Sequence, residues 1–540
     1  MTLEQLVEAY GEKFVKYILV IGADVEIKDV KLTEIQSSAV EALRPHAEQV
    51  LIEQNPFLKN SHKMGILGAV NQEGKASISE VRKLCGGQMP KPGNHSDKLL
   101  QLLTEFVIDA YPATLILPDT NDPVGRTLWP HISSLAFRHE KSDELLVELL
   151  KDQSISRLFP GAPDPSELIG DKSKQTEVMA NISWSNGSGG SFQLVQLPES
   201  ITAATFRRAM LNGEASIEDI LAKVPEILTE VRKLAEGKTI NVPVVVGLSN
   251  IVINKGESVT LNNGLLRPIR EEDKIWNLWK PDTAPEVKAV LVTTAELRVI
   301  HKSVWKPGEG TSPEEFAANV EKQKPILEKV HKTNEQTINK CRLALLLASE
   351  EDKLITATDI TRSMLNPLAA IAPSSWRRDA MNIYPEVQID KRLAENITKW
   401  SRLIAEKFPN NLDLGMRRLL SATTSRLDPL DGFVDAVICW ENVFGTSEGE
   451  VSFRVCASIA KVLEPDNIKR RELFKILKDH YDKRSKLVHG GSEPSISDSY
   501  KMRDYCIKVA IHIIKKVISD DNLASADSAS SRSKLILLGT

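Results

Sequence analysis

The chain has 540 residues, of which 41% are hydrophobic and 26% charged, and its formal net charge is -4. That length is enough for two to four domains with their own cores, and the composition is that of an ordinary soluble protein. The small net charge excludes a surface that is basic throughout, so any nucleic-acid-binding face must be local. Aromatic residues make up only 5%, which argues against a protein that reads bases mainly by stacking.

The cysteines and the N-terminus bear on compartment and cofactors. The five cysteines are far apart and form no CxxC pair, so we expect no disulfide, no structural zinc and no other metal or cofactor. The first residues carry Glu4, Glu8 and Glu12 where a signal peptide would be basic. No apolar run approaches the roughly 20 residues that cross a bilayer. We therefore expect a soluble cytoplasmic protein without a membrane partner.

Residues 1–170 are expected to be mostly helical, because 37–54 and 97–110 repeat apolar side chains at the helical period. Residues 75–87 resemble the first part of a helix-turn-helix, but no basic recognition helix follows, and two packed helices are the simpler interpretation. The apolar run 113–117 is either a strand or a buried turn. This region indicates no function.

Residues 174–300 are expected to form a small α+β module. Residues 177–184 and 192–197 flank a glycine-rich tip and predict a β-hairpin. The tip lacks the following Lys-Ser/Thr of a phosphate-binding loop. A helical insertion is expected at 205–236. Further strands are expected at 242–247, 250–254, 258–261 and 287–292.

Residues 312–388 are expected to be a helical connector. Ser312 and Pro313 predict a helix start, with serine as the N-cap and proline at the first helical position. A strongly apolar helix continues through 340–348, and the proline-bearing stretch 367–385 predicts a joint between domains.

Residues 389–518 are expected to be an all-helical bundle, which makes the chain mainly α with a central α+β module. Amphipathic or apolar helices are expected around 393–404, 412–427, 433–444 and 500–518. The last of these is apolar nearly all round, so His512 is expected to be a core histidine. The Ser/Ala/Asp-rich residues 519–540 are expected to be a disordered tail.

The most distinctive stretch is 479–491, which predicts a helix end with a glycine stop. Arg484 and His489 are separated by four residues, and Ser485 shares a face with His489 if the helix continues that far. An imidazole beside a permanent cation suits proton transfer at a phosphodiester. The spacing alone is weak evidence, because Arg126 and His131 repeat it by accident.

Three blocks resemble the HEPN superfamily, specifically its ApeA-like branch: an aspartate-bearing helix that ends in a glutamate, the following helix, and the R-x4-6-H signature with its trailing glycine. They lie at 431–441, 453–463 and 481–490. The resemblance covers about 390–518, a quarter of the chain. Two departures are Cys439-Trp440, in place of a plainer aliphatic pair, and Ser485, where many members have Asn or Asp.

The resemblance implies a metal-independent RNase, built as a homodimer with two facing motifs, that leaves 2′,3′-cyclic phosphate and 5′-OH ends. Arg484 and His489 would then be catalytic, with Ser485, Tyr481 and Glu441 in support. Glu441 is expected to be a structural partner for a nearby arginine and not a catalytic acid, and Arg454 is the candidate for that arginine. Tyr481 fits the core stripe.

The charge around the motif agrees with an RNA partner. Thirteen Lys/Arg stand against seven Asp/Glu between residues 466 and 516, a net of +6 in a chain of net -4. Lys483 and Lys486 are candidate phosphate contacts. The alternative, that these two lysines simply lie on a solvent-exposed face, has the same weight.

Together these features predict an RNA endonuclease whose residues 1–388 sense a trigger, phage-derived or from a regulatory partner, in antiphage defence by abortive infection. Such a protein is a toxin that is held inactive until triggered. The alternative is a non-catalytic HEPN scaffold that binds RNA or protein. A third possibility is a DNA-binding regulator built on the N-terminal helices.

Overall fold

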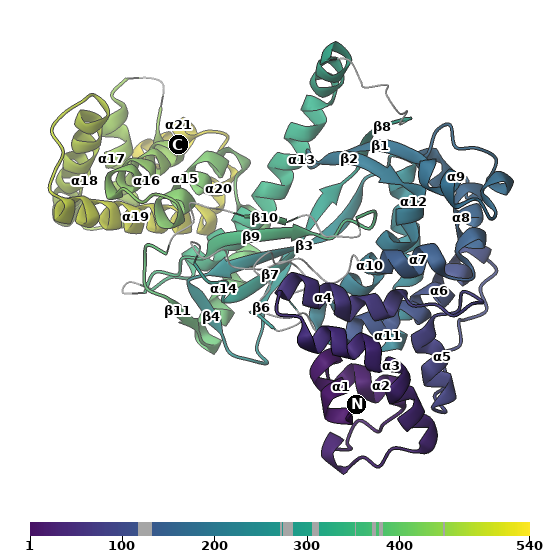
Figure 1. The fold of residues 1–540 in the computed structure, drawn as a ribbon. Coiled ribbons are helices and arrows are strands. Elements are labelled where there is room, and N and C mark those ends of the chain that lie inside the picture. Colours follow the sequence, from purple (N-terminus) through teal and green to yellow (C-terminus); the bar gives the residue numbers. More distant parts are fainter. Residues whose placement is uncertain are drawn as a thin grey trace.

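The computed structural model describes residues 1–116, 132–270, 273, 285–304, 313–350, 353–369, 374–376, 382–446 and 449–539. The chain is mainly helical, with β-sheets in the middle, N-terminal helices on one side and a C-terminal helical bundle on the other (Figure 1). The expected fold class is therefore confirmed. Within the described ranges, no helix is both long and apolar enough to cross a membrane.

The N-terminal region is helical, as expected. Residues 113–117 overlap a 3-10 helix, Tyr111–Leu115, so the turn and not the strand is right for the described part of that run. Arg126 and His131 lie outside the described residues. The helices are α1 (Leu3–Tyr10), α2 (Glu12–Leu19), α3 (Glu34–Ile52), α4 (Pro56–Gly65), α5 (Ser77–Leu84), α6 (Lys98–Ala110), α7 (Ile132–Arg138), α8 (Ser142–Lys151) and α9 (Lys172–Glu177).

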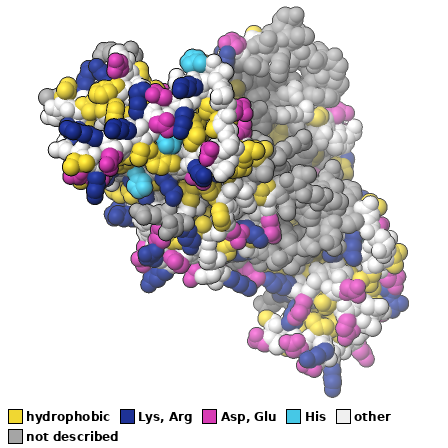
Figure 2. Space-filling model, turned by 90° about the vertical axis from the view of Figure 1, so that its left-hand side faces the viewer, with side chains coloured by type: hydrophobic (Ala, Val, Ile, Leu, Met, Phe, Trp, Pro, Cys, Tyr) yellow, Lys and Arg dark blue, Asp and Glu magenta, His cyan; other side chains and the backbone are white. Residues whose placement is uncertain are grey.

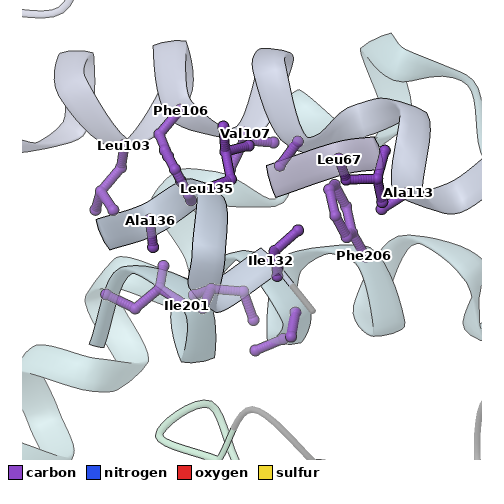
Figure 3. Close-up of a cluster of buried hydrophobic side chains, with 14 of the residues drawn as sticks. Leu67, Leu103, Phe106, Val107, Ala113, Ile132, Leu135, Ala136, Ile201 and Phe206 are labelled. Carbon is purple, nitrogen blue, oxygen red and sulfur yellow. The ribbon is translucent and has the colours of Figure 1, made fainter. Parts of the chain in front are cut away.

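This region is held together by a core to which α10 (Leu197–Ala209) also contributes. Figure 3 shows side chains of α6, α7 and α10 pointing toward one another. Among them, Phe106 is 2% exposed and Phe206 is fully buried. Full burial of one such side chain stabilises the fold by about 1.5–3 kcal/mol. The helical insertion expected at 205–236 continues as α11 (Ile217–Leu221) and α12 (Val224–Ala235).

The expected hairpin is confirmed: β1 and β2 pair antiparallel, with Met179 opposite Gln193. They form a three-stranded sheet in the order β2-β1-β8, and a six-stranded antiparallel sheet has the order β10-β9-β3-β7-β6-β5. The strands are β1 (Met179–Trp184), β2 (Gly189–Gln193), β3 (Ile240–Ser249), β4 (Ile251–Ile253), β5 (Val259–Leu261), β6 (Gly264–Pro268), β7 (Ala289–Leu297), β8 (Val299–Val304), β9 (Thr358–Met364), β10 (Ser374–Trp376) and β11 (Val387–Ile389).

The expectation of a wholly helical connector at 312–388 is wrong in part. A long helix, α13 (Pro313–Leu347), does start at the expected proline, and Ser312 lies outside the described residues. The chain then returns to the sheet: β9 pairs with β3, and β11 pairs in parallel with β4. The sheet region therefore extends well beyond residue 300.

The six-stranded sheet separates two hydrophobic cores. Because side chains alternate across a strand, Val245 of β3 belongs to the N-terminal core, whereas its neighbours Val244 and Val246 belong to the other. The second core continues through the last turns of α13 into the C-terminal bundle. The sheet is thus shared by the regions on its two sides.

The C-terminal bundle is entirely helical where it is described. Its helices are α14 (Lys391–Lys407), α15 (Asp413–Thr424), α16 (Pro429–Phe444), α17 (Val451–Leu463), α18 (Asn467–Val488), α19 (Ile496–Ser519), α20 (Asp521–Ser525) and α21 (Ala529–Leu538). The disordered tail is a wrong expectation, because α21 packs against α16 and α17. His512 is also not a core residue: it is exposed on α19, and its Nδ1 lies 2.8 Å from the Lys508 carbonyl oxygen.

Candidate active site

The end of α18 positions the candidate residues. Asp466 caps its start by accepting hydrogen bonds from the Ile468 and Lys469 amides, at 3.0 and 2.9 Å. The helix ends at Val488, and Gly490 follows with φ of +82°. The Gly490 amide donates to the Leu487 carbonyl and the Gly491 amide to the Lys486 carbonyl, at 3.2 and 2.8 Å. This is the glycine stop expected from the sequence, and a side chain at 490 would strain it.

Glu441, in the last turn of α16, binds two residues of α18. Its Oε1 accepts a hydrogen bond from the Tyr481 hydroxyl at 2.5 Å, and its Oε2 forms an ion pair with Arg484 Nη2 at 3.2 Å. The expected link to Arg454 is wrong; Arg484 is the partner. Burial raises the pKa of Tyr481, and the bond to Glu441 raises it further, so the phenol stays protonated and donates.

Glu441 holds the Arg484 guanidinium in place, but not all of its N–H donors have hydrogen-bond partners among the described residues. The Arg484 side chain is 20% exposed, and its Nε is buried with no hydrogen-bond partner among the described residues. The exposed part of this guanidinium is what an incoming anion can reach, and hydrogen bonds from a charged donor to an anion are among the strong ones. The carboxylate therefore orients the arginine while leaving part of its hydrogen-bonding capacity for a ligand.

His489 lies just past the helix, at the C-cap position, and is exposed. Its amide donates to the Ser485 carbonyl at 3.2 Å, but in the described part of the chain no hydrogen bond joins its ring to Arg484 or to the Ser485 hydroxyl. The structure thus brings Tyr481, Arg484 and Glu441 together and leaves the imidazole at the same helix end, open to solvent.

The two candidate phosphate contacts differ in their surroundings. Lys483 is exposed and pairs with Asp479 at 2.7 Å, one turn away on α18. Lys486 is exposed and has no ion pair within the described ranges. Lys486 is therefore the better placed of the two for a phosphate, although the advantage is small, because an i, i+4 pair such as that of Lys483 contributes only about 0.3–0.5 kcal/mol.

Two arrangements near this site were not expected from the sequence. The Asp435 carboxylate, 3% exposed, binds Arg418 and Arg426 at 2.7 Å each and ties α15 to α16. The His480 ring stacks on Tyr505 of α19, with centroids 4.7 Å apart. Both involve residues on different helices, so no local signal marks them.

The face of the bundle around α18 is basic and apolar together. Figure 2 shows Lys and Arg side chains interspersed with exposed hydrophobic ones on this side. Large hydrophobic side chains are exposed on α17, α18 and α19 themselves. They are Phe453, Ile468, Ile476, Val488, Ile496 and Tyr500.

Comparisons of the chain with protein-family models, curated proteins and solved structures return no match. The similarity to the HEPN superfamily therefore rests on the three sequence blocks. No cluster of three or more His, Cys, Asp or Glu suited to hold a metal occurs among the residues that the structure describes.

We expect Glu441→Gln to lower RNA cleavage about tenfold, since misorienting a group at a reacting centre raises the barrier. Glutamine keeps the size and one acceptor for Tyr481 but loses the charge that holds Arg484. Single-turnover cleavage and the melting temperature measure the effect. Glu472→Gln, exposed on α18, is the matched control, and equal rates for the two variants would contradict the role of Glu441.

Proposed function

We propose that the C-terminal bundle is a metal-independent RNA endonuclease of the HEPN type. The observation that carries the proposal is the Glu441 carboxylate, which fixes Tyr481 and Arg484 on α18 at the helix end where His489 is exposed. An oriented guanidinium and a free imidazole are the two groups that transesterification of a phosphodiester requires.

The chemistry uses a nucleophile that RNA itself carries. His489 takes the proton from the 2′-OH or gives one to the 5′-oxygen that leaves, and the 2′-oxygen attacks the phosphorus as the P–O5′ bond breaks. Arg484 binds the phosphate and stabilises the charge that develops on its oxygens. The products are a 2′,3′-cyclic phosphate and a 5′-OH. DNA lacks the 2′-OH and is not cut.

The working form in this proposal is a homodimer. The reaction needs a general base and a general acid, and one subunit supplies only one Arg484 and one exposed His489 at this site. In a dimer, the two facing histidines can take the two roles. The exposed apolar side chains on α17, α18 and α19 are the surfaces on which this proposal places the second copy.

Residues 1–388 are the regulatory part in this proposal, and the role is antiphage defence by abortive infection with a phage-derived or regulatory trigger. We place the protein in the cytoplasm, since all five cysteines are free thiols and RNA is there. The shared core between sheet and bundle supports regulation, because a change in the sheet region acts directly on the bundle.

The second candidate is a non-catalytic HEPN scaffold. It is favoured by one observation: Arg484 already has a carboxylate partner, and no bond among the described residues links it to His489. In that case the basic face binds RNA without cutting it.

The nuclease and the scaffold are separated by an RNA oligonucleotide and the same sequence with 2′-deoxyribose throughout. We expect the purified protein to cut the RNA into fragments with cyclic phosphate ends and to leave the deoxy strand intact, since the nucleophile is missing. Binding of both strands without cleavage would favour the scaffold, and equal cleavage of both would contradict the mechanism.

A further inference from the structure

A cavity of about 310 Å³ lies where the sheet region meets the bundle. Residues 353–354 and 384–387 line one side, next to β11, and Asp504 and Lys508 of α19 line the other. Small-molecule sites favour such junctions, and pockets for small ligands begin at roughly this volume, about 300 Å³.

The lining combines an apolar surface with charges suited to an anion. Leu354, Pro385 and Val387 are apolar. Lys508 has no ion pair within the described ranges, and the Lys353 ammonium donates to the Gln388 carbonyl at 3.3 Å.

The acidic groups are partly neutralised. Asp504 accepts a hydrogen bond from the Tyr384 hydroxyl at 2.8 Å and pairs with Arg503 Nη2 at 2.9 Å. Glu386 is the remaining acid, and it is exposed to solvent. The lining therefore carries two lysines and two carboxylates, and one of these carboxylates, Asp504, is paired with Arg503 behind it.

Arg503 adds an independent sign of a missing ligand. It is 3% exposed and lies between the rings of Tyr384 and Tyr500, at 5.0 and 4.9 Å from their centroids. Its Nη1 is buried and has no hydrogen-bond partner among the described residues. Two of its contacts, Tyr384 and Asp504, line the cavity, so an anion bound there would lie close to the positive charge of this guanidinium.

We propose that this cavity binds a small phosphorylated ligand, of the size of a nucleoside monophosphate, and that the ligand regulates the nuclease. Lys353 and Lys508 contact the phosphate, and the apolar lining with the Tyr384 ring holds the flat body of the ligand. The claim that a ligand binds depends only on the cavity. The claim that the ligand regulates cleavage rests on the proposed nuclease function.

The route to the active site is short. A Cβ placed on Gly432 would lie 2.8 Å from the Arg503 side chain, so α16 packs directly on this arginine. The same helix carries Glu441, which holds Arg484. A ligand that moves Arg503 therefore acts on the helix that orients the catalytic arginine.

Binding is tested on the full chain carrying His489→Ala, so that nuclease activity plays no part. Isothermal titration and thermal shift with AMP, inorganic phosphate and adenosine are compared. We expect AMP to bind and raise the melting temperature, with Lys508→Ala weakening it about tenfold and Lys399→Ala, exposed on α14, leaving it unchanged. The proposal is overturned if AMP does not bind, if adenosine or phosphate binds as tightly, or if Lys508→Ala binds like its parent.

Regulation is tested on the otherwise unaltered chain with and without AMP. We expect AMP to change the cleavage rate at least threefold and Tyr384→Phe, which keeps the ring but not the bond to Asp504, to remove that response while AMP still binds. Binding without any change in rate would overturn the regulatory half. If AMP binds but the chain cleaves no RNA either with or without it, the nuclease proposal fails instead.

Discussion

Replacing Arg484 by alanine should lower the rate of RNA cleavage by about two to three orders of magnitude, the cost of losing one charged group that stabilises a transition state. Glu441 fixes this guanidinium, and the Arg484 side chain is 20% exposed, so a phosphate oxygen can approach it. Single-turnover cleavage of an RNA oligonucleotide at saturating protein measures the effect.

Two further variants make that result specific. Arg484→Lys keeps the positive charge but loses the planar fork, so we expect a smaller loss of rate than with alanine. Arg402→Ala removes an arginine that is 68% exposed on α14, and it should cleave at the wild-type rate. An Arg484→Ala protein as active as the Arg402→Ala control would exclude Arg484 from catalysis.

Replacing Arg532 by alanine should destabilise the bundle by about 2–5 kcal/mol, the range for truncating a large buried side chain to alanine. Arg532 is fully buried in α21. It donates to the carbonyls of Leu523 and Val443, at 3.2 and 3.1 Å, and to the Asn411 side chain. Alanine leaves a cavity and three acceptors without their donor.

Urea unfolding followed by tryptophan fluorescence measures this loss. Lys534→Ala, exposed on the same helix, should unfold at the wild-type midpoint. If Arg532→Ala unfolds at that midpoint too, the C-terminal helices do not pack on the bundle as described. The result would then favour a disordered tail.

The sequence was informative where signals are local. The glycine stop after α18 follows from Gly490 and Gly491, because a helix end is decided within a few residues. The hairpin was predicted from its glycine-rich turn in the same way. The residues of the candidate site could also be identified in the sequence, but the pairing of Glu441 with Tyr481 and Arg484 could not.

Long-range contacts could not be predicted. Strand β9 carries Asp359 and Arg362, which look like solvent-exposed residues in a sequence. In the structure Arg362 pairs with both Asp359 and Glu335 of α13, so these charges are accommodated inside the sheet region. Glu335 lies 27 residues from Arg362 in the sequence, and no local pattern indicates this pairing.

The tail was misjudged for a related reason. Its composition suggests disorder because it has few large apolar residues. Leu523 is buried in the second core, and Leu535 and Ile536 pack against it. Polar anchors add to these: Ser528 caps α21 by accepting from the Ser531 amide at 3.1 Å, and the Ser533 and Ser458 hydroxyls are 2.9 Å apart in the interior. Composition cannot distinguish a buried arginine and paired serines from the polar residues of a solvated tail.

The role of His489 is tested by incubating total RNA in EDTA with wild-type protein, His489→Ala and His512→Ala, and by mapping the fragment ends. His512 is an exposed histidine of the same bundle and serves as the control. We expect cleavage by the wild type and by His512→Ala, 2′,3′-cyclic phosphate ends, and a loss of about two to four orders of magnitude for His489→Ala. If purified protein is inactive, toxicity of the same three chains on induced expression gives the comparison. Equal activity of His489→Ala and the wild type would contradict the assignment of the active site.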